Sequence, residues 1–137
     1  MASALVNLGG SSVYGLGAPP GKEASEIGIQ DPTRSTRVAL TVPLHDRALS
    51  VAGGYERFFE KDGVTYSHIM NPRAGRPVPG VLGVAVLGLS AADALDEVLF
   101  VEGARRAPAV LKKHPSTEAV FFLPEPAKRW KLIRVRP

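Results

Sequence analysis

The stretch Val81–Leu89 is the feature of this sequence that most constrains its fold. It reads VLGVAVLGL, a continuous apolar run that contains no polar side chain. A run of this kind and length is typical of a strand that is buried on both faces. The sequence therefore predicts a core strand here, in a chain whose 137 residues fit one domain, residues 1–137, with a buried core.

Two helices are expected after this strand. The segment SAADALDEVLFVEG places Ser90 at the first N-cap and Gly103 at the helix end, as helix-boundary preferences favour. Its apolar positions predict one buried stripe, made of Ala91, Leu95, Val98, Leu99 and Val101. A second helix is expected in PAVLKKH, with Pro108 in its first turn.

The other segments read as strands. Residues 55–60 and 64–69 are rich in aromatic and β-branched side chains, and the Lys61-Asp62-Gly63 turn between them predicts a hairpin. Further strands are expected at 4–8, 13–16, 27–30, 37–44, 118–123 and 130–135. The prediction is an α+β fold, a largely antiparallel sheet with two helices late in the chain.

Composition excludes several classes of protein. Hydrophobic residues make up 45% and charged residues 22%, the balance of a soluble globular domain. Cysteine is absent, which excludes disulfides, thiolate metal sites and cysteine nucleophiles. No membrane span or signal peptide is visible, and localisation stays unassigned. Basic residues crowd the last third, but only Trp130 interleaves with them, which argues against a nucleic-acid-binding platform.

Two groups of residues could take part in catalysis or metal binding. His68 ends a hairpin strand directly before a loop stiffened by prolines that carries Arg73 and Arg76, so it could move a proton while the arginines pair with phosphate. Its alternative role is a structural hydrogen bond. Asp93 and Glu97 are four residues apart, so both carboxylates share one helix face, where they could hold Mg²⁺. Their alternative role is to stabilise the positive end of the helix.

Five stretches, taken in order, resemble the ApbE family, the FAD:protein FMN transferases. They are ALVNLGG, IGIQDP, ALSVAGGYERFF, YSHIMNPRAGRPV and SAADALDEVLFVEG, and together they cover roughly Ala4–Gly103. The resemblance implies a T-fold-like half of an ApbE-type domain. It also implies a Mg²⁺-dependent reaction that splits FAD and attaches FMN to a threonine or serine of a target flavoprotein.

The same resemblance suggests roles for individual residues. It matches His68 to a catalytic histidine near the pyrophosphate, and Asp93 and Glu97 to metal ligands. The residues matched to the cofactor site are Gly9, Gly10, Gly53, Tyr55, Asn71 and Arg73.

The chain departs from the family pattern at several of these positions. Val51 and Ala52 stand where hydroxyl residues are common, and Asn71 and Ala74 replace aspartate and threonine. Glu97 replaces a metal-binding threonine, which changes the charge that would face the phosphates.

Family chains are about twice as long, so this one is expected to correspond to their C-terminal half, with the N-terminal half absent. It could be a truncated reading frame, part of a split protein or a reduced descendant. Its partners would be FAD, an acceptor flavoprotein, and either a missing N-terminal half or a second copy. The alternative function is a non-catalytic remnant or partner-binding domain. Family members are often periplasmic or membrane-anchored.

Overall fold

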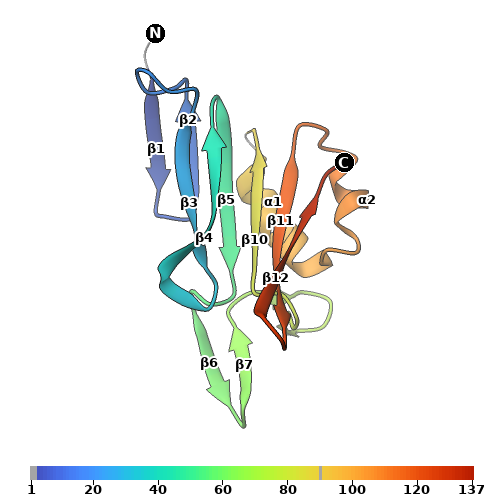
Figure 1. Cartoon of the computed structure of the whole chain (residues 1–137). Helices are drawn as coiled ribbons and strands as arrows, with labels where there is room; N and C mark the ends of the chain where they lie inside the picture. Colours follow the sequence, from blue (N-terminus) through green and yellow to red (C-terminus); the bar gives the residue numbers. More distant parts are fainter. Residues whose placement is uncertain (1–2, 90) are drawn as a thin grey trace.

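The computed structural model describes residues 3–89 and 91–137, and its main feature is a six-stranded antiparallel sheet. Its order is β1-β2-β5-β10-β11-β12, so β5 joins β2 on one side and β10 on the other, two strands that are not its neighbours in the sequence (Figure 1). These strands are Ala4–Leu8, Ser12–Leu16, Arg47–Gly53, Gly83–Gly88, Glu118–Glu125 and Arg129–Val135. With two helices beside it, the sheet confirms the expected α+β class.

Strand β10 lies inside the sheet, between β5 and β11. All six of its residues are buried, as the apolar run predicted. Side chains alternate across a strand, so β10 contributes to two cores at once. Val84 and Val86 face the helices, whereas Ala85 and Leu87 face the opposite layer.

Helices α1 (Ala92–Glu102) and α2 (Ala107–Leu111) cover one face of the sheet. The predicted end of the first helix is confirmed, because Gly103 has φ 76° and donates its N–H to the Leu99 carbonyl at 2.8 Å. The predicted N-cap, Ser90, lies outside the described residues. Ala91 precedes the first helical residue and provides no side-chain cap.

The predicted apolar stripe of α1 is wrong at one position. Val98 is 45% exposed, because it lies off the arc that faces the sheet. Ala91 and Val101 are only partly buried at the margins of that arc. The residues buried on α1 are Ala92, Leu95, Asp96, Leu99 and Phe100, with the spacing of a single helical face.

The opposite face is covered by a long hairpin of β3 (Ser25–Asp31) and β4 (Arg34–Leu44). Ile29, Val42 and Leu44 are buried there against the underside of the sheet. Gly15 on β2 permits the close approach of this layer, since a Cβ at that position would lie 2.8 Å from the Leu44 Cβ.

Two smaller hairpins lie beyond the end of the sheet. β6 (Phe58–Lys61) pairs with β7 (Val64–Ser67), and the Asp62-Gly63 turn has φ 53° and 75°, as a two-residue hairpin turn requires. This confirms the predicted hairpin, although its strands are shorter than expected. It projects away from the rest of the fold (Figure 1). The second pairs β8 (Met70–Asn71) with β9 (Arg76–Pro77).

Strand β1 forms an edge of the main sheet and is exposed along its whole length. On the side that carries α1, Val6 lies opposite Tyr14 of β2 and Leu8 lies opposite Ser12, whereas Leu16 of β2 lies opposite Ala4. Val6, Leu8 and Leu16 are 46%, 67% and 44% exposed. Separately, no helix among residues 3–89 and 91–137 is both long and apolar enough to cross a membrane.

Candidate functional site

A recess called here the polar cavity has a volume of about 600 Å³ and lies where several strands end. The turn between β1 and β2 forms one wall, and β3 forms another. The end of β5 continues into Tyr55 and Arg57, and His68 and Glu97 complete the lining. It thus brings together six of the predicted site residues: Gly9, Gly10, Gly53, Tyr55, His68 and Glu97.

Gly53 and Tyr55 are coupled by packing. A Cβ on Gly53 would lie 2.7 Å from the Tyr55 ring, so only glycine lets the ring rest over this backbone. Burial, with a smaller contribution from Glu56, raises the pKa of Tyr55 to about 12. The phenol therefore presents a neutral hydroxyl at neutral pH, which can both donate and accept a hydrogen bond.

His68 is held by the carbonyl of Arg57, across the base of the β6–β7 hairpin. The His68 backbone N–H donates to that carbonyl at 3.0 Å, and its Nδ1 lies 3.1 Å from the same oxygen. Because a carbonyl only accepts, the neutral ring carries its proton on Nδ1. Nε2 then keeps its lone pair, on a side chain that is exposed to solvent.

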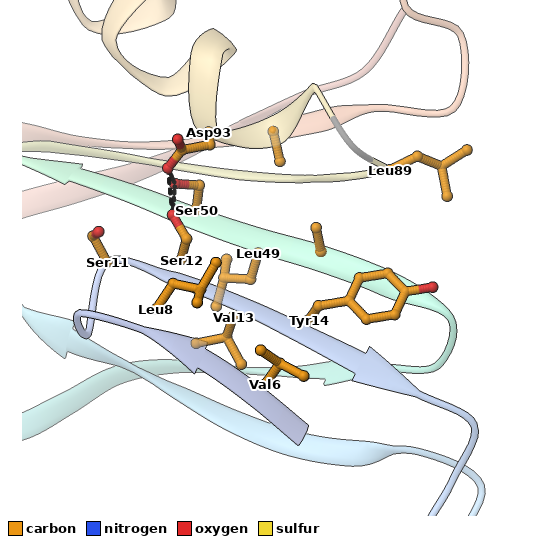
Figure 2. A pocket seen from close by; sticks show the side chains of 12 residues that line it. Val6, Leu8, Ser11, Ser12, Val13, Tyr14, Leu49, Ser50, Leu89 and Asp93 are labelled. Atoms are coloured by element: carbon orange, nitrogen blue, oxygen red, sulfur yellow. Dashed lines mark hydrogen bonds between the residues drawn. The ribbon is translucent and has the colours of Figure 1, made fainter. Parts of the chain in front are cut away.

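A group of hydroxyls and carboxylates joins the sheet to the first turns of α1. Ser12 donates to Asp93 Oδ1, and Ser50 lies 3.2 Å from the same oxygen and 2.8 Å from Asp96 Oδ2. Figure 2 shows Ser12 and Ser50 pointing toward Asp93 from two neighbouring strands. The two hydroxyl oxygens are 3.0 Å apart. We call Ser12, Ser50, Asp93 and Asp96 the acid group.

Proton counting limits the hydrogen bonds that Ser50 can donate within this group. Ser50 has a single hydroxyl proton, so it can donate to only one of its two carboxylate neighbours. Burial, and to a smaller extent the neighbouring Glu97, raises the pKa of Asp96 to about 7. The hydrogen bond from Ser50 acts in the opposite direction and lowers this pKa. Ser50 donates to Asp96 when that carboxylate is ionised, and once Asp96 is protonated the Ser50 hydroxyl can donate to Asp93 instead.

Sequence reasoning missed three members of this group, Ser12, Ser50 and Asp96. Asp96 could have been found from spacing, because it lies four residues after Ala92 and one after Leu95, on the buried arc. It is 3% exposed. An acid at such a position indicates a buried polar partner, whereas the serines have no comparable pattern.

Replacing Asp96 with asparagine is expected to stabilise the metal-free protein above pH 7. The folded pKa is raised to about 7 from 3.8, so the proton held by the folded state contributes stability that is lost as pH rises between those values. Asparagine keeps a hydrogen-bonding group without the charge, and the expected gain at pH 8 is on the order of 2 kcal/mol, with little change at pH 4. Urea denaturation with a chelator present measures this difference.

The control is Asp62→Asn, which removes a carboxylate from the exposed hairpin turn. Its effect on the unfolding free energy should be the same at both pH values. Parallel pH profiles for Asp96→Asn and the parent protein would contradict the buried, protonated Asp96.

A second recess, called here the apolar cavity, has a volume of about 470 Å³ and begins at the acid group. Val6, Leu8 and Tyr14 form its floor on β1 and β2, and Leu89 lies on its far side (Figure 2). Asp93 lines this cavity, whereas Glu97 lines the polar one. The two recesses adjoin, because Ser11, Val13 and Leu49 line both, so the two acids lie one helical turn apart at neighbouring recesses.

Asn71 and Arg73 do not line the polar cavity. The Asn71 Oδ1 accepts the backbone N–H of Arg73 at 2.9 Å and that of Ala74 at 3.3 Å, which closes the turn between β8 and β9. Arg73 forms an ion pair with Glu102 at 2.9 Å, and Arg106 pairs with the same carboxylate at 3.1 Å. These contacts fasten the loop after His68 to the end of α1.

The donor set suits a partial Mg²⁺ shell. Asp93 and Glu97 are exposed carboxylates one helical turn apart, and Mg²⁺ favours one or two carboxylates together with waters and substrate phosphates. Within residues 3–89 and 91–137, no group of three or more His, Cys, Asp or Glu side chains is arranged as a metal site. A cation here would therefore depend on ligands from a bound substrate and water.

Comparison with known proteins decides the family. The model of the ApbE family matches residues 1–121. The chain belongs to the ApbE family. Among curated members, it is 37% identical over 135 residues to an FAD:protein FMN transferase of Treponema pallidum and 32% identical over 124 residues to one of Salmonella typhimurium.

Solved ApbE structures have the same fold. The ApbE protein of Thermotoga maritima matches 96% of this chain with a TM-score of 0.79 at 29% identity. The flavin transferase ApbE of Vibrio cholerae matches 95% with a TM-score of 0.75, also at 29% identity. The expected fold is thereby confirmed for nearly the whole chain.

The match covers only part of each relative. This chain spans 37% of the Treponema pallidum protein and 34% of the Salmonella typhimurium one, and 42% and 41% of the two solved chains. The polar cavity and the acid group thus belong to a segment of about two fifths of a typical ApbE protein.

Proposed function

We propose that this chain contributes the catalytic histidine and the acidic metal site of an FAD:protein FMN transferase. The observation that carries the proposal is that His68, Glu97, Gly53 and Tyr55 line one cavity in an ApbE-family chain. FAD is the flavin donor, and the acceptor is a threonine or serine of a target flavoprotein.

In the proposed reaction, His68 acts as the general base. The acceptor oxygen forms a bond with the FMN phosphorus, and the bond between that phosphorus and the AMP oxygen breaks, with its electron pair leaving on AMP. The hydroxyl proton moves to His68 Nε2, whose lone pair is free because Nδ1 is held by the Arg57 carbonyl. A base fixed in this way contributes typically about 10²–10⁴-fold to such a rate.

The acids of α1 prepare the site for the diphosphate. Asp93 and Glu97 would hold Mg²⁺, which when bound neutralises charge on the phosphates. Ser12 and Ser50 fix the Asp93 carboxylate by hydrogen bonds, so it is pre-oriented before any ligand arrives. Tyr55 offers its hydroxyl at the cavity wall, and Gly9 and Gly10 keep the opposite wall free of side chains.

Asn71 and Arg73 have a supporting part in this proposal. Their side chains hold the loop that follows His68 and fix it to Glu102. We assign them to positioning the site and not to contact with the nucleotide.

The test is to incubate the chain with FAD, Mg²⁺ and a flavin-free protein substrate of the Treponema pallidum relative. Intact-mass spectrometry should show the mass of one FMN added to the substrate, with AMP released and the reaction stopped by a chelator. A parallel mixture adds the part of that relative that this chain does not match. Absence of the FMN mass in both mixtures would overturn the proposal.

A second candidate function is partner binding without catalysis. It is favoured by the exposed apolar side chains on β1 and β2, among them Val6, Leu8 and Leu16, and by the missing hydroxyls at Val51 and Ala52 in the cavity wall. Equilibrium dialysis separates the two functions: Mg²⁺-dependent FAD binding in the micromolar range supports the transferase, and its absence supports the partner-binding domain.

A further inference from the structure

A third recess, called here the hairpin groove, lies beside the β6–β7 hairpin and has a volume of about 500 Å³. Its exposed surface is mainly apolar and comes from Phe58, Phe59, Tyr66, Met70 and Pro77, while Arg57, Ser67 and His68 also line it. Several of these side chains are strongly exposed: Phe58 is 55%, Phe59 60% and Met70 48% accessible to solvent. Exposed aromatic side chains gathered at one projecting element are typical of a surface that binds another protein.

The aromatic surface is ordered before any partner arrives. Phe59 and Tyr66 face each other across the hairpin and stack with ring centroids 5.0 Å apart and an interplanar angle of 11°. The Asp62-Gly63 turn fixes the register of the two strands. A rigid aromatic pair loses little conformational freedom on binding, which is a property of interface hot spots.

The hairpin groove meets the polar cavity at His68. Arg57 and His68 line both recesses, so the imidazole stands at the boundary between them. The polar cavity is lined by the acids Glu56 and Glu97 and by the backbone of a glycine turn, whereas no acid lines the groove. The chemistry of the groove therefore suits apolar polypeptide side chains, and that of the cavity suits a nucleotide with its diphosphate.

We propose that the hairpin groove binds the acceptor protein, as an extended segment that carries the receiving hydroxyl. This inference rests on the proposed function, because that reaction needs a hydroxyl of the acceptor to reach His68 while FAD occupies the polar cavity. The continuity of the groove with the polar cavity through His68 selects this occupant. Within the described part of the chain, β6 and β7 pair only with each other, so an extended segment could also add to an open strand edge.

The test measures FMN transfer and acceptor binding separately, with the flavin-free substrate protein of the Treponema pallidum relative as the probe. Two variants remove apolar side chains from the groove: Met70→Ser, and the double variant Phe59→Ser with Tyr66→Ser. Loss of hot-spot side chains is expected to raise the KM for the acceptor about tenfold or more. Both kcat and the Kd for FAD should stay within about twofold, because the groove lies outside the nucleotide cavity.

The control is Leu132→Ser, which removes a comparably exposed apolar side chain from β12, on a different element. It should leave every constant unchanged. An unchanged acceptor KM in both groove variants would overturn the proposal, and so would a parallel loss of FAD binding, which would indicate a structural effect. The Met70 variant keeps the test valid if the double variant disturbs the hairpin.

Direct binding of the acceptor, followed by fluorescence anisotropy, distinguishes this inference from the proposed function. If the wild-type chain binds the acceptor without transferring FMN, and the groove variants do not bind it, the proposed transferase function is refuted and the proposed docking groove is supported. Wild-type chain that transfers FMN, with groove variants that bind and react normally, would refute the groove alone.

Discussion

Replacing His68 with asparagine is expected to lower the rate of FMN transfer about 10²–10⁴-fold, the usual contribution of a general base. An asparagine amide can still donate to the Arg57 carbonyl, which holds Nδ1 in the parent protein. The substitution therefore keeps the hydrogen bond to the Arg57 carbonyl and removes the basic Nε2 atom. Single-turnover assays with saturating FAD measure the rate, and FAD binding should change little.

A matched control exists in the same chain. His45 also directs Nδ1 at a backbone carbonyl, that of Glu23 at 2.7 Å, and does not line the polar cavity. His45→Asn should transfer FMN at the parent rate. Equal rates for His68→Asn and the parent would exclude His68 as the base and would leave it the structural role that its bond to Arg57 already provides.

Truncating Phe100 to alanine is expected to destabilise the fold by about 3–5 kcal/mol, as for other buried phenylalanines. Its ring is fully buried in the core on the helix side of the sheet. It also supports the segment that shapes the polar cavity, because a Cβ on Gly54 would lie 3.2 Å from the end of this ring. Urea denaturation should show the loss, and the melting temperature should fall by about 10–20 °C.

The neighbouring exposed position on the same helix provides the control. Val98→Ala removes an apolar side chain that is 45% exposed, so its effect on the unfolding free energy should stay within about 0.5 kcal/mol. If Val98→Ala lowered the unfolding free energy as much as Phe100→Ala, Val98 would have to be buried against the sheet. The helix would then have the orientation that the apolar pattern of the sequence predicted.

The elements of this fold could be predicted where one local pattern governed them. The run at 81–89 predicted a strand buried on both faces, and Asp62-Gly63 predicted a hairpin. The orientation of α1 was only partly predictable, because Val98 and Phe100 are both apolar and neither outweighs the other in the pattern. Packing against β10 and β5 decides which of them is buried.

The candidate site was predictable only in part, for a different reason. His68 and Glu97 lie 29 positions apart, and only the resemblance to a family suggested that they share a recess. The acid group needs contacts between β2, β5 and α1, which no spacing in the sequence encodes. The charge of Arg73 suggested a phosphate contact, but its guanidinium pairs with Glu102, a partner that becomes visible only when the loop meets the helix.

The double role of β10 has a consequence for how this domain can change over generations. Alternate side chains of the strand fill two separate cores, so a larger residue at Ala85 crowds one layer and a larger residue at Val86 crowds the other. Both faces of the strand are shielded from water, so a larger side chain cannot turn toward solvent. Substitutions in this strand should therefore be poorly tolerated. The side chains of the projecting β6–β7 hairpin are largely exposed and do not fill either core. Their identity can therefore change together with the surface of a binding partner.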